Sequence, residues 1–252
     1  MEEQNVNQTN FNLPHDVLTL PSGGKFYKSK KKSVKVGFLT AADENILANA
    51  SNMSGDQVIS QLIRSKVYEP DLKIDEMLEG DIEAILIFLR NTAFGPEYTF
   101  SLTDPETGNR FESILSLEEL NFLKPEVEPD ENGLYSLTLP KSNKNIKIKL
   151  LTFGDKKELS ERENSYPKNM VAPKVTWRLS KQIISIDGNE DKTEIVKFIE
   201  KMPIMDSKFI TNFVNRNQPS LNLEKEIIAP SGKSVLTRVT FGAEFFRPFF
   251  SI

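Results

Sequence analysis

The chain has 252 residues, of which 38% are hydrophobic and 27% are charged, and its formal net charge is −4. These values predict a globular protein with one large domain or two small ones, and the acidic balance argues against sustained nucleic-acid binding. The sequence has no Cys and a single His, His15, which excludes disulfides and thiolate metal sites. A His-based metal site or a catalytic triad would depend on that one residue.

The N-terminal segment predicts a flexible arm followed by irregular backbone. Residues 1–12 are rich in Asn and Gln, with little to bury, and they are not a secretory signal. No apolar stretch reaches the ~18 residues of a membrane helix, so we expect a soluble protein of a reducing compartment, without membrane insertion. Residues 13–32 contain Pro21 and the Gly23-Gly24 pair, which favour a sharp turn. A phosphate-binding loop is excluded because Phe26 follows Lys25 where Ser or Thr is required.

Helical patterns dominate the segments near 40–90 and 190–217. Residues 34–38 alternate as a short strand, and Thr40 offers an N-cap for the helix that follows. Further helices are predicted over 56–67 and from Asp75 to Gly95-Pro96, with Gly80 as a break point. The second of these carries a core-facing stripe at i, i+3, i+4 and i+7: Ile82, Ile85, Leu86 and Leu89.

Hairpin patterns dominate the segments 98–150 and 220–241. Alternating pairs of runs predict three hairpins, at 98–102 with a return from Phe111, at 134–139 with 146–150, and at 221–228 with 235–241. Residues 115–123 predict a short helix or turn, 155–165 a charged helix, and 175–179 and 183–186 strands. Residues 195–202 repeat at helical spacing, and Asp206 or Ser207 is expected to cap the last helix. Because helices and hairpins are segregated, the pattern predicts an α+β fold.

The C-terminus is the most distinctive part of the sequence. Aromatic rings are costly to leave in water, so the tail is expected to dock either on its own core or on a partner. Phe26 and Tyr27, which follow the glycine turn, are the other aromatic residues on irregular backbone. Aromatic and Arg side chains are frequent interface anchors, and the predicted protein-interface residues are Phe26, Tyr27, Phe245, Phe246, Arg247, Phe249 and Phe250.

No residue set in the sequence assembles a reaction, so no catalytic residue, metal ligand or cofactor is assigned. Carboxylates are plentiful and a pair could run acid–base hydrolysis, but nothing singles out a pair. Asp104, Glu106 and Asn109 do not fit the calcium-loop pattern. Two alternatives stay open beside an interaction protein: a carboxylate hydrolase, and a nucleic-acid module that uses the basic run near residues 28–35.

Several segments, taken in order, resemble baseplate hub and hub-assembly proteins of T-even-like, contractile-tailed bacteriophages. They are residues 20–27 (LPSGGKFY), 34–47 (VKVGFLTAADENIL), 93–98 (AFGPEY) and 239–248 (VTFGAEFFRP). The resemblance implies a non-enzymatic structural subunit of the tail baseplate, made in the host cytoplasm, whose partners are other baseplate and tail proteins. A transient hub-assembly chaperone that is absent from the mature virion is the alternative.

Relatives in that family often carry Cys-x-x-Cys in the hairpin after the Gly-Pro-Glu-Tyr segment, where the pair looks like a zinc knuckle. Here residues 103–108 take that place without a thiolate, so no metal is expected. The later hairpin around Pro230 and Gly232 has a similar layout, which suggests a duplicated helix–hairpin unit. The predicted organisation is an arm (1–12), a first helix-plus-hairpin unit (13–124) and a second hairpin/helix unit with the aromatic tail (125–252).

Overall fold

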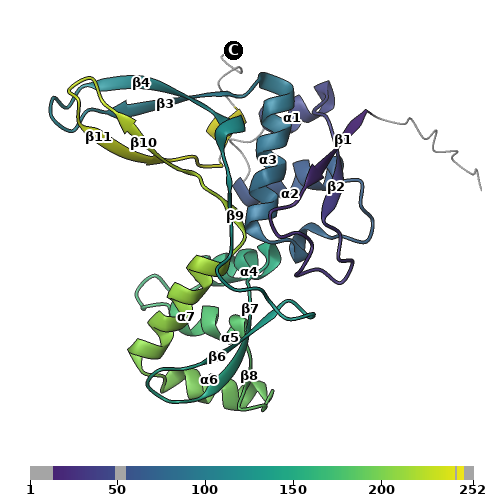
Figure 1. Cartoon of the computed structure of the whole chain (residues 1–252), viewed down its shortest axis with the longest axis vertical. Coiled ribbons are helices and arrows are strands. Elements are labelled where there is room, and N and C mark those ends of the chain that lie inside the picture. The colour runs from purple at the N-terminus through teal and green to yellow at the C-terminus, as the bar shows by residue number, and fades with distance from the viewer. Residues whose placement is uncertain (1–13, 49–54, 242, 247–252) are drawn as a thin grey trace, which may run out of the picture.

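Helices and small antiparallel sheets alternate along the computed structural model, which describes residues 14–48, 55–241 and 243–246 (Figure 1). The predicted α+β class is confirmed. The predicted N-terminal arm, residues 1–12, lies outside the described residues. In the described part of the chain, no helix is both long enough and apolar enough to cross a membrane.

The N-terminal sheet contains a strand that the sequence did not reveal. β1 (His15–Thr19) pairs antiparallel with β2 (Ser33–Gly37), so the prediction of irregular backbone over 13–32 is wrong for its first part. β1 has little alternation of its own and Val17 is exposed, so its conformation depends on pairing with β2 rather than on local pattern. The turn-rich loop 20–32 connects the two strands.

One buried helix organises the first half of the chain. The helices in order are α1 (Ala41–Ala48), α2 (Gly55–Lys66), the 3₁₀ turn η2 (Ile74–Glu76) and α3 (Glu79–Phe94). The predicted stripe of α3 is fully buried. Gly80 does not break the helix: a Cβ there would collide with the backbone carbonyl of Pro219, so the glycine lets the chain after α7 cross α3 closely.

Two hairpins lie side by side and project from α3 as an arm (Figure 1). They are β3 (Glu97–Thr103) with β4 (Arg110–Ser116), and β10 (Glu224–Ile228) with β11 (Ser234–Arg238). Both were predicted. The order helix then hairpin occurs twice, as α3–β3–β4 and α7–β10–β11; a duplication stays a prediction.

Most of the remaining elements form a second body that carries the predicted middle hairpin. Its elements are β6 (Leu134–Thr138), β7 (Asn145–Lys149), α4 (Phe153–Asn164), α5 (Lys174–Gln182), β8 (Ile183–Ile186), α6 (Lys192–Glu200) and α7 (Ile204–Asn217). Four short elements lie outside this body: η3 (Leu117–Glu119), β5 (Phe122–Leu123), β9 (Ser220–Leu221) and α8 (Ala243–Phe246). β6, β7 and β8 make a three-stranded antiparallel sheet, and β5 pairs with β9.

Two expectations in this body are wrong. The expected strand at 175–179 is helix α5, which begins after Pro173; its buried residues Trp177 and Leu179 lie on opposite sides of the helix, and Trp177 packs against Tyr166. The last helix begins at Ile204 after Pro203, so neither Asp206 nor Ser207 is its N-cap. Asp206 instead accepts the backbone N–H groups of Lys141 at 2.8 Å and Ser142 at 3.0 Å.

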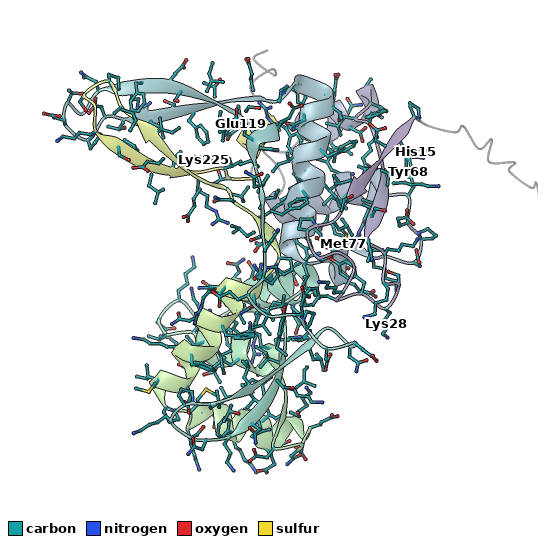
Figure 2. The ribbon with its side chains drawn as sticks, viewed as in Figure 1. His15, Lys28, Tyr68, Met77, Glu119 and Lys225 are labelled. Atoms are coloured by element: carbon teal, nitrogen blue, oxygen red, sulfur yellow. The ribbon has the colours of Figure 1, made fainter. Side chains whose placement is uncertain are left out.

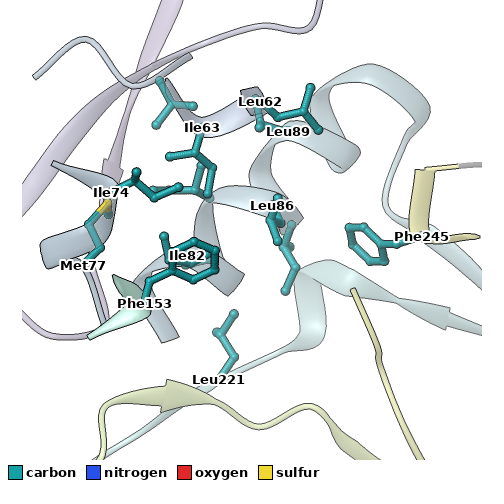
Figure 3. Packing of buried hydrophobic residues seen from close by; sticks show 14 of the residues in the cluster. Leu62, Ile63, Ile74, Met77, Ile82, Leu86, Leu89, Phe153, Leu221 and Phe245 are labelled. Carbon is teal, nitrogen blue, oxygen red and sulfur yellow. The ribbon is translucent and has the colours of Figure 1, made fainter. Parts of the chain in front are cut away.

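The buried apolar residues form two clusters, and the first surrounds α3 (Figure 3). The grouping differs from the predicted units, because residues after 220 return to the first cluster: Leu221, Leu223, Val239, Phe245 and Phe246. Apart from Leu78, the buried residues of the second cluster lie between Tyr135 and Val214, whereas Phe153 in the same range belongs to the first cluster. Residues 124–219, hereafter the insert, therefore begin after β5 and end before β9, whose pairing brings the two ends of the insert together.

Candidate docking surfaces

Tyr27, a predicted interface residue, is buried in the chain's own core. Its hydroxyl donates to the carboxylate of Asp81 and accepts the backbone N–H of Leu78 at 2.9 Å. Asp81 also accepts the backbone N–H of Ser22 at 2.9 Å. Burial raises the pKa of both the Asp81 carboxyl and the Tyr27 hydroxyl. Tyr27 therefore fixes loop 20–32 onto the start of α3 and offers no exposed ring to a partner.

Phe26 lies where the two clusters meet. It is half-buried and packs against both, and its ring centroid is 6.2 Å from that of Tyr135. The neighbouring Lys25 forms an ion pair with Glu128 of the insert. Phe26 thus makes a contact inside this chain, between loop 20–32 and the insert.

The C-terminal rings pack against the first cluster, which is one of the two alternatives that the sequence left open. Phe245 is 0% exposed and Phe246 is 3% exposed. Their rings meet edge to face, with centroids 5.1 Å apart, and Phe241 makes a similar contact with Phe245 at 4.9 Å. Figure 3 shows Phe245 close to Leu86 of α3. Arg247, Phe249 and Phe250 lie outside the described residues.

Arg90 holds this end of the chain, and the sequence analysis missed it. Its Nε donates to the carbonyl of Phe245 at 3.0 Å, Nη1 to that of Gly95 at 3.0 Å, and Nη2 to that of Glu97 at 2.9 Å. The guanidinium also lies over the rings of Tyr98 and Phe245. The sequence feature that could have indicated this role is a single Arg in a predominantly apolar helix, about one turn before the Gly-Pro pair that ends it.

The turns of the two arm hairpins are linked to each other. Asp104 is buried, and it accepts the hydroxyl of Ser231 at 2.8 Å and the backbone N–H of Ser231 at 3.0 Å. A carboxylate thus connects the hairpins at the place where the resemblance puts Cys-x-x-Cys. Within the described ranges, no group of three or more His, Cys, Asp or Glu is placed to hold a metal ion.

The basic run near residues 28–35 is used in part within the chain, through Lys30 and Lys31, while Lys32 and Lys35 are exposed. Lys31 pairs with Glu69 and with Asp71, the latter at 2.6 Å. The ammonium of Lys30 donates to the backbone carbonyls of Lys25 and Glu131. Lys28 remains exposed on the loop (Figure 2). These internal partners weaken the nucleic-acid alternative, because phosphate binding needs several free cations on one face.

Exposed apolar side chains of the described residues gather in four places. The arm exposes Ile114, Ile228 and Leu236, the β5 region exposes Phe122, Leu123 and Val127, the loop before α5 and its first turn expose Met170, Val171 and Val175, and the start of α7 exposes Ile204 and Met205. Such groups are the accessible candidates for docking, because exposed apolar clusters mark interaction sites more often than scattered residues do.

Comparison with known proteins gives one match. The family model described as T4 bacteriophage base plate protein matches residues 14–247. Searches of curated proteins and of solved structures found no significant match. The matched range includes both core clusters, the arm and α8. The chain therefore belongs to the T4 bacteriophage base plate protein family.

Proposed function

We propose that this chain is a non-enzymatic structural subunit of the hub region of a phage tail baseplate, and that it works by docking onto other baseplate proteins. The observation that carries the proposal is the family match over residues 14–247. Family membership implies a structural role in the baseplate; the hub location and the docking mechanism are our proposal.

The hydrogen bonds and ion pairs of several buried carboxylates support a non-enzymatic role. Asp81 is bound by Tyr27 and Ser22, and Asp206 by two backbone N–H groups. Asp43 forms a buried ion pair with Lys66. Carboxylates with such partners hold the fold together. A hydrolase needs a pair facing a substrate cleft, and the pair that this alternative would have to use is Glu79 and Glu83, which line a groove beside α3.

We propose that the docking residues include Arg247, Phe249 and Phe250. The supporting contact is the one between Arg90 and the carbonyl of Phe245, which fixes the chain directly before these residues. A segment that starts from a fixed point loses less conformational freedom on binding than one on a long free tail.

The test removes residues 247–252 during infection and counts assembled baseplates by electron microscopy. We expect assembly to stop while the purified truncated protein melts like the full chain. Unchanged assembly would remove the tail from the docking surface, and an early melt would assign it to the core.

Mass spectrometry of purified virions tests the structural role itself. We expect peptides of this chain at a fixed ratio to other baseplate proteins. If the chain is found in assembly intermediates but not in virions, it is the transient hub-assembly chaperone instead.

A further inference from the structure

The start of α7 carries an apolar surface, hereafter the α7 patch, formed by Pro140, Ile204, Met205 and Phe209. Ile204 is 73% exposed and Met205 is 60% exposed. The geometry is fixed, because Asp206 binds the backbone of the turn after Pro140 and so holds that turn against the first turn of α7. The patch is therefore a built surface and does not arise from a mobile loop.

The charges near the α7 patch are positive. Lys141, Lys201 and Lys208 are exposed and adjoin the patch in sequence, and no carboxylate of the described residues lies within 4.0 Å of their ammonium groups. Of the nearest acids in sequence, Asp206 is completely buried, whereas Glu200 beside Lys201 is exposed. The net charge of the surrounding residues 134–218 is also positive, since they contain 16 Lys and Arg against 10 Asp and Glu. The α7 patch thus suits a partner that is apolar and acidic.

The same chain exposes side chains of that chemistry around β5, hereafter the β5 strip: Glu118, Glu119, Phe122, Leu123 and Val127, with Lys124 as an exposed cation among them. Phe122 is 47% exposed and Leu123 is 48% exposed, although both belong to a strand. Figure 2 shows Glu119 beside the base of the arm. No cation among the described residues pairs with Glu118 or Glu119 within 4.0 Å. Outside residues 134–218 the chain carries 16 Lys and Arg against 26 Asp and Glu.

The β5 strip and the α7 patch of one molecule lie at opposite ends of the same helix. Phe122 pairs with Leu221, just beyond the C-terminal end of α7, whereas Ile204 is its first residue. A helix of 14 residues spans about 21 Å at 1.5 Å per residue. The two surfaces therefore cannot meet within one molecule, but each is free to meet the other on a neighbour.

We propose that a second copy of this chain occupies the α7 patch, with the β5 strip of one copy lying on the α7 patch of the next. The contact is heterologous, because it joins two different surfaces, so each bound copy leaves one surface of each kind open for a further copy. Complementary charge steers the encounter, and the apolar residues supply the buried area. The inference does not depend on the proposed hub role, which needs contacts with other proteins only.

The test uses sedimentation velocity of the full chain at low and high salt. The patch variant carries Lys141→Glu with Lys208→Glu, and the strip variant carries Glu118→Lys with Glu119→Lys. We expect the unaltered chain to associate in a concentration- and salt-dependent way, and each variant alone to associate at least about tenfold more weakly, because like charges then face each other. An equal mixture of the two variants should regain association, since every contact between unlike copies is again complementary.

A matched control carries Lys168→Glu with Lys192→Glu, two exposed lysines away from the patch, and changes the net charge by the same amount as the patch variant. This control should associate like the unaltered chain. A further variant, Ile204→Ser with Met205→Ser, removes apolar area from the α7 patch and should weaken association at both salt concentrations. A chain that stays monomeric at all concentrations would overturn the proposal. So would variants that associate normally, a mixture that fails to recover, or a control that loses as much as the patch variant.

Discussion

At the scale of single residues, Arg90 is a buried cation that joins α8 to the end of α3 and the start of β3. Its side chain is almost completely buried, and its guanidinium donates to three backbone carbonyls. In Arg90→Met the helix keeps its apolar volume but the carbonyls of Phe245, Gly95 and Glu97 lose their donor. We expect a loss of about 2–4 kcal/mol in the free energy of unfolding, measured by urea titration.

A control for this prediction is Arg64→Met. Arg64 is exposed and forms an ion pair with the exposed Asp75 at 3.5 Å, so we expect Arg64→Met to lower the free energy of unfolding by less than about 0.5 kcal/mol. If Arg90→Met behaved like this control, the buried hydrogen bonds would not hold the C-terminal segment.

Glu83 makes stability depend on pH. It is 7% exposed in a groove between α3, Phe153 and residues 238–241, and burial, with Glu79 nearby, raises its pKa to about 7, against the opposing effect of Arg238 and Lys156. The folded chain therefore prefers the protonated carboxyl. Its contribution to stability is largest below the unfolded pKa of 4.5 and is lost as pH rises through about 7.

Substitution of Glu83 by Gln should remove this dependence. At about pH 8 we expect the free energy of unfolding of Glu83→Gln to exceed that of the unaltered chain by about 1–3 kcal/mol. At about pH 5 the two values should agree within about 0.5 kcal/mol. Chemical denaturation at both pH values measures the difference. Glu112→Gln, on the exposed face of β4, should leave the pH profile unchanged; an equal gain in both variants would contradict the assignment.

At the scale of elements, the arm depends on contact between its two hairpins. An isolated two-stranded hairpin is marginally stable in water, so each hairpin needs the other and α3. We expect Asp104→Ala, which removes both bonds to Ser231, to increase amide hydrogen exchange in β10 and β11 while exchange in α3 stays slow. Ser231→Ala should have a smaller effect, because its backbone N–H still reaches Asp104.

The neighbouring Glu106→Ala is the control for the arm. The side chain of Glu106 is exposed in the same turn, so exchange should match that of the unaltered chain. Faster exchange throughout the molecule in Asp104→Ala would mean that the turn supports the whole core and not the arm alone.

At the scale of the whole molecule, Phe245 and Phe246 tie the last described helix to the first core cluster. Removal of residues 245–252 takes away two buried rings, and each such loss costs about 3–5 kcal/mol. We expect this truncation to lower the melting temperature strongly or to prevent folding, whereas removal of 247–252 leaves the melt unchanged. Differential scanning calorimetry of both truncations separates the contributions, and equal melts would place the rings outside the core.

Local pattern predicted the parts of this fold that local interactions decide. The stripe of α3 and the three hairpins were found because their apolar spacing and turn residues are contained in short segments. The segment 175–179 was misassigned because Val175, Trp177 and Leu179 alternate in a way that suits a strand, and short apolar runs do not separate the two periods. β1 was not predicted because its strand conformation depends on pairing with β2 and not on a pattern in its own residues.

The site was only partly predictable for the same physical reason. The sequence indicated that Phe245 and Phe246 had to be covered, since exposed rings are costly. It could not indicate what covers them, because Arg90 and Phe245 are 155 positions apart in the chain. The exposure of Ile204 and Met205 could not be predicted from the sequence either. It follows from the helix start after Pro203 and from the turn after Pro140, which Asp206 holds in place.

The insertion of residues 124–219 between two paired strands has a consequence for biosynthesis. A ribosome delivers the insert before it delivers Leu221, Leu223, Val239 and the closing phenylalanines that the first cluster needs. We therefore expect the nascent chain to fold its middle while α3 still shows apolar surface, in contrast to the usual N-terminal-first order. The residues up to Phe246 must be translated before the earliest-made helices can be fully covered.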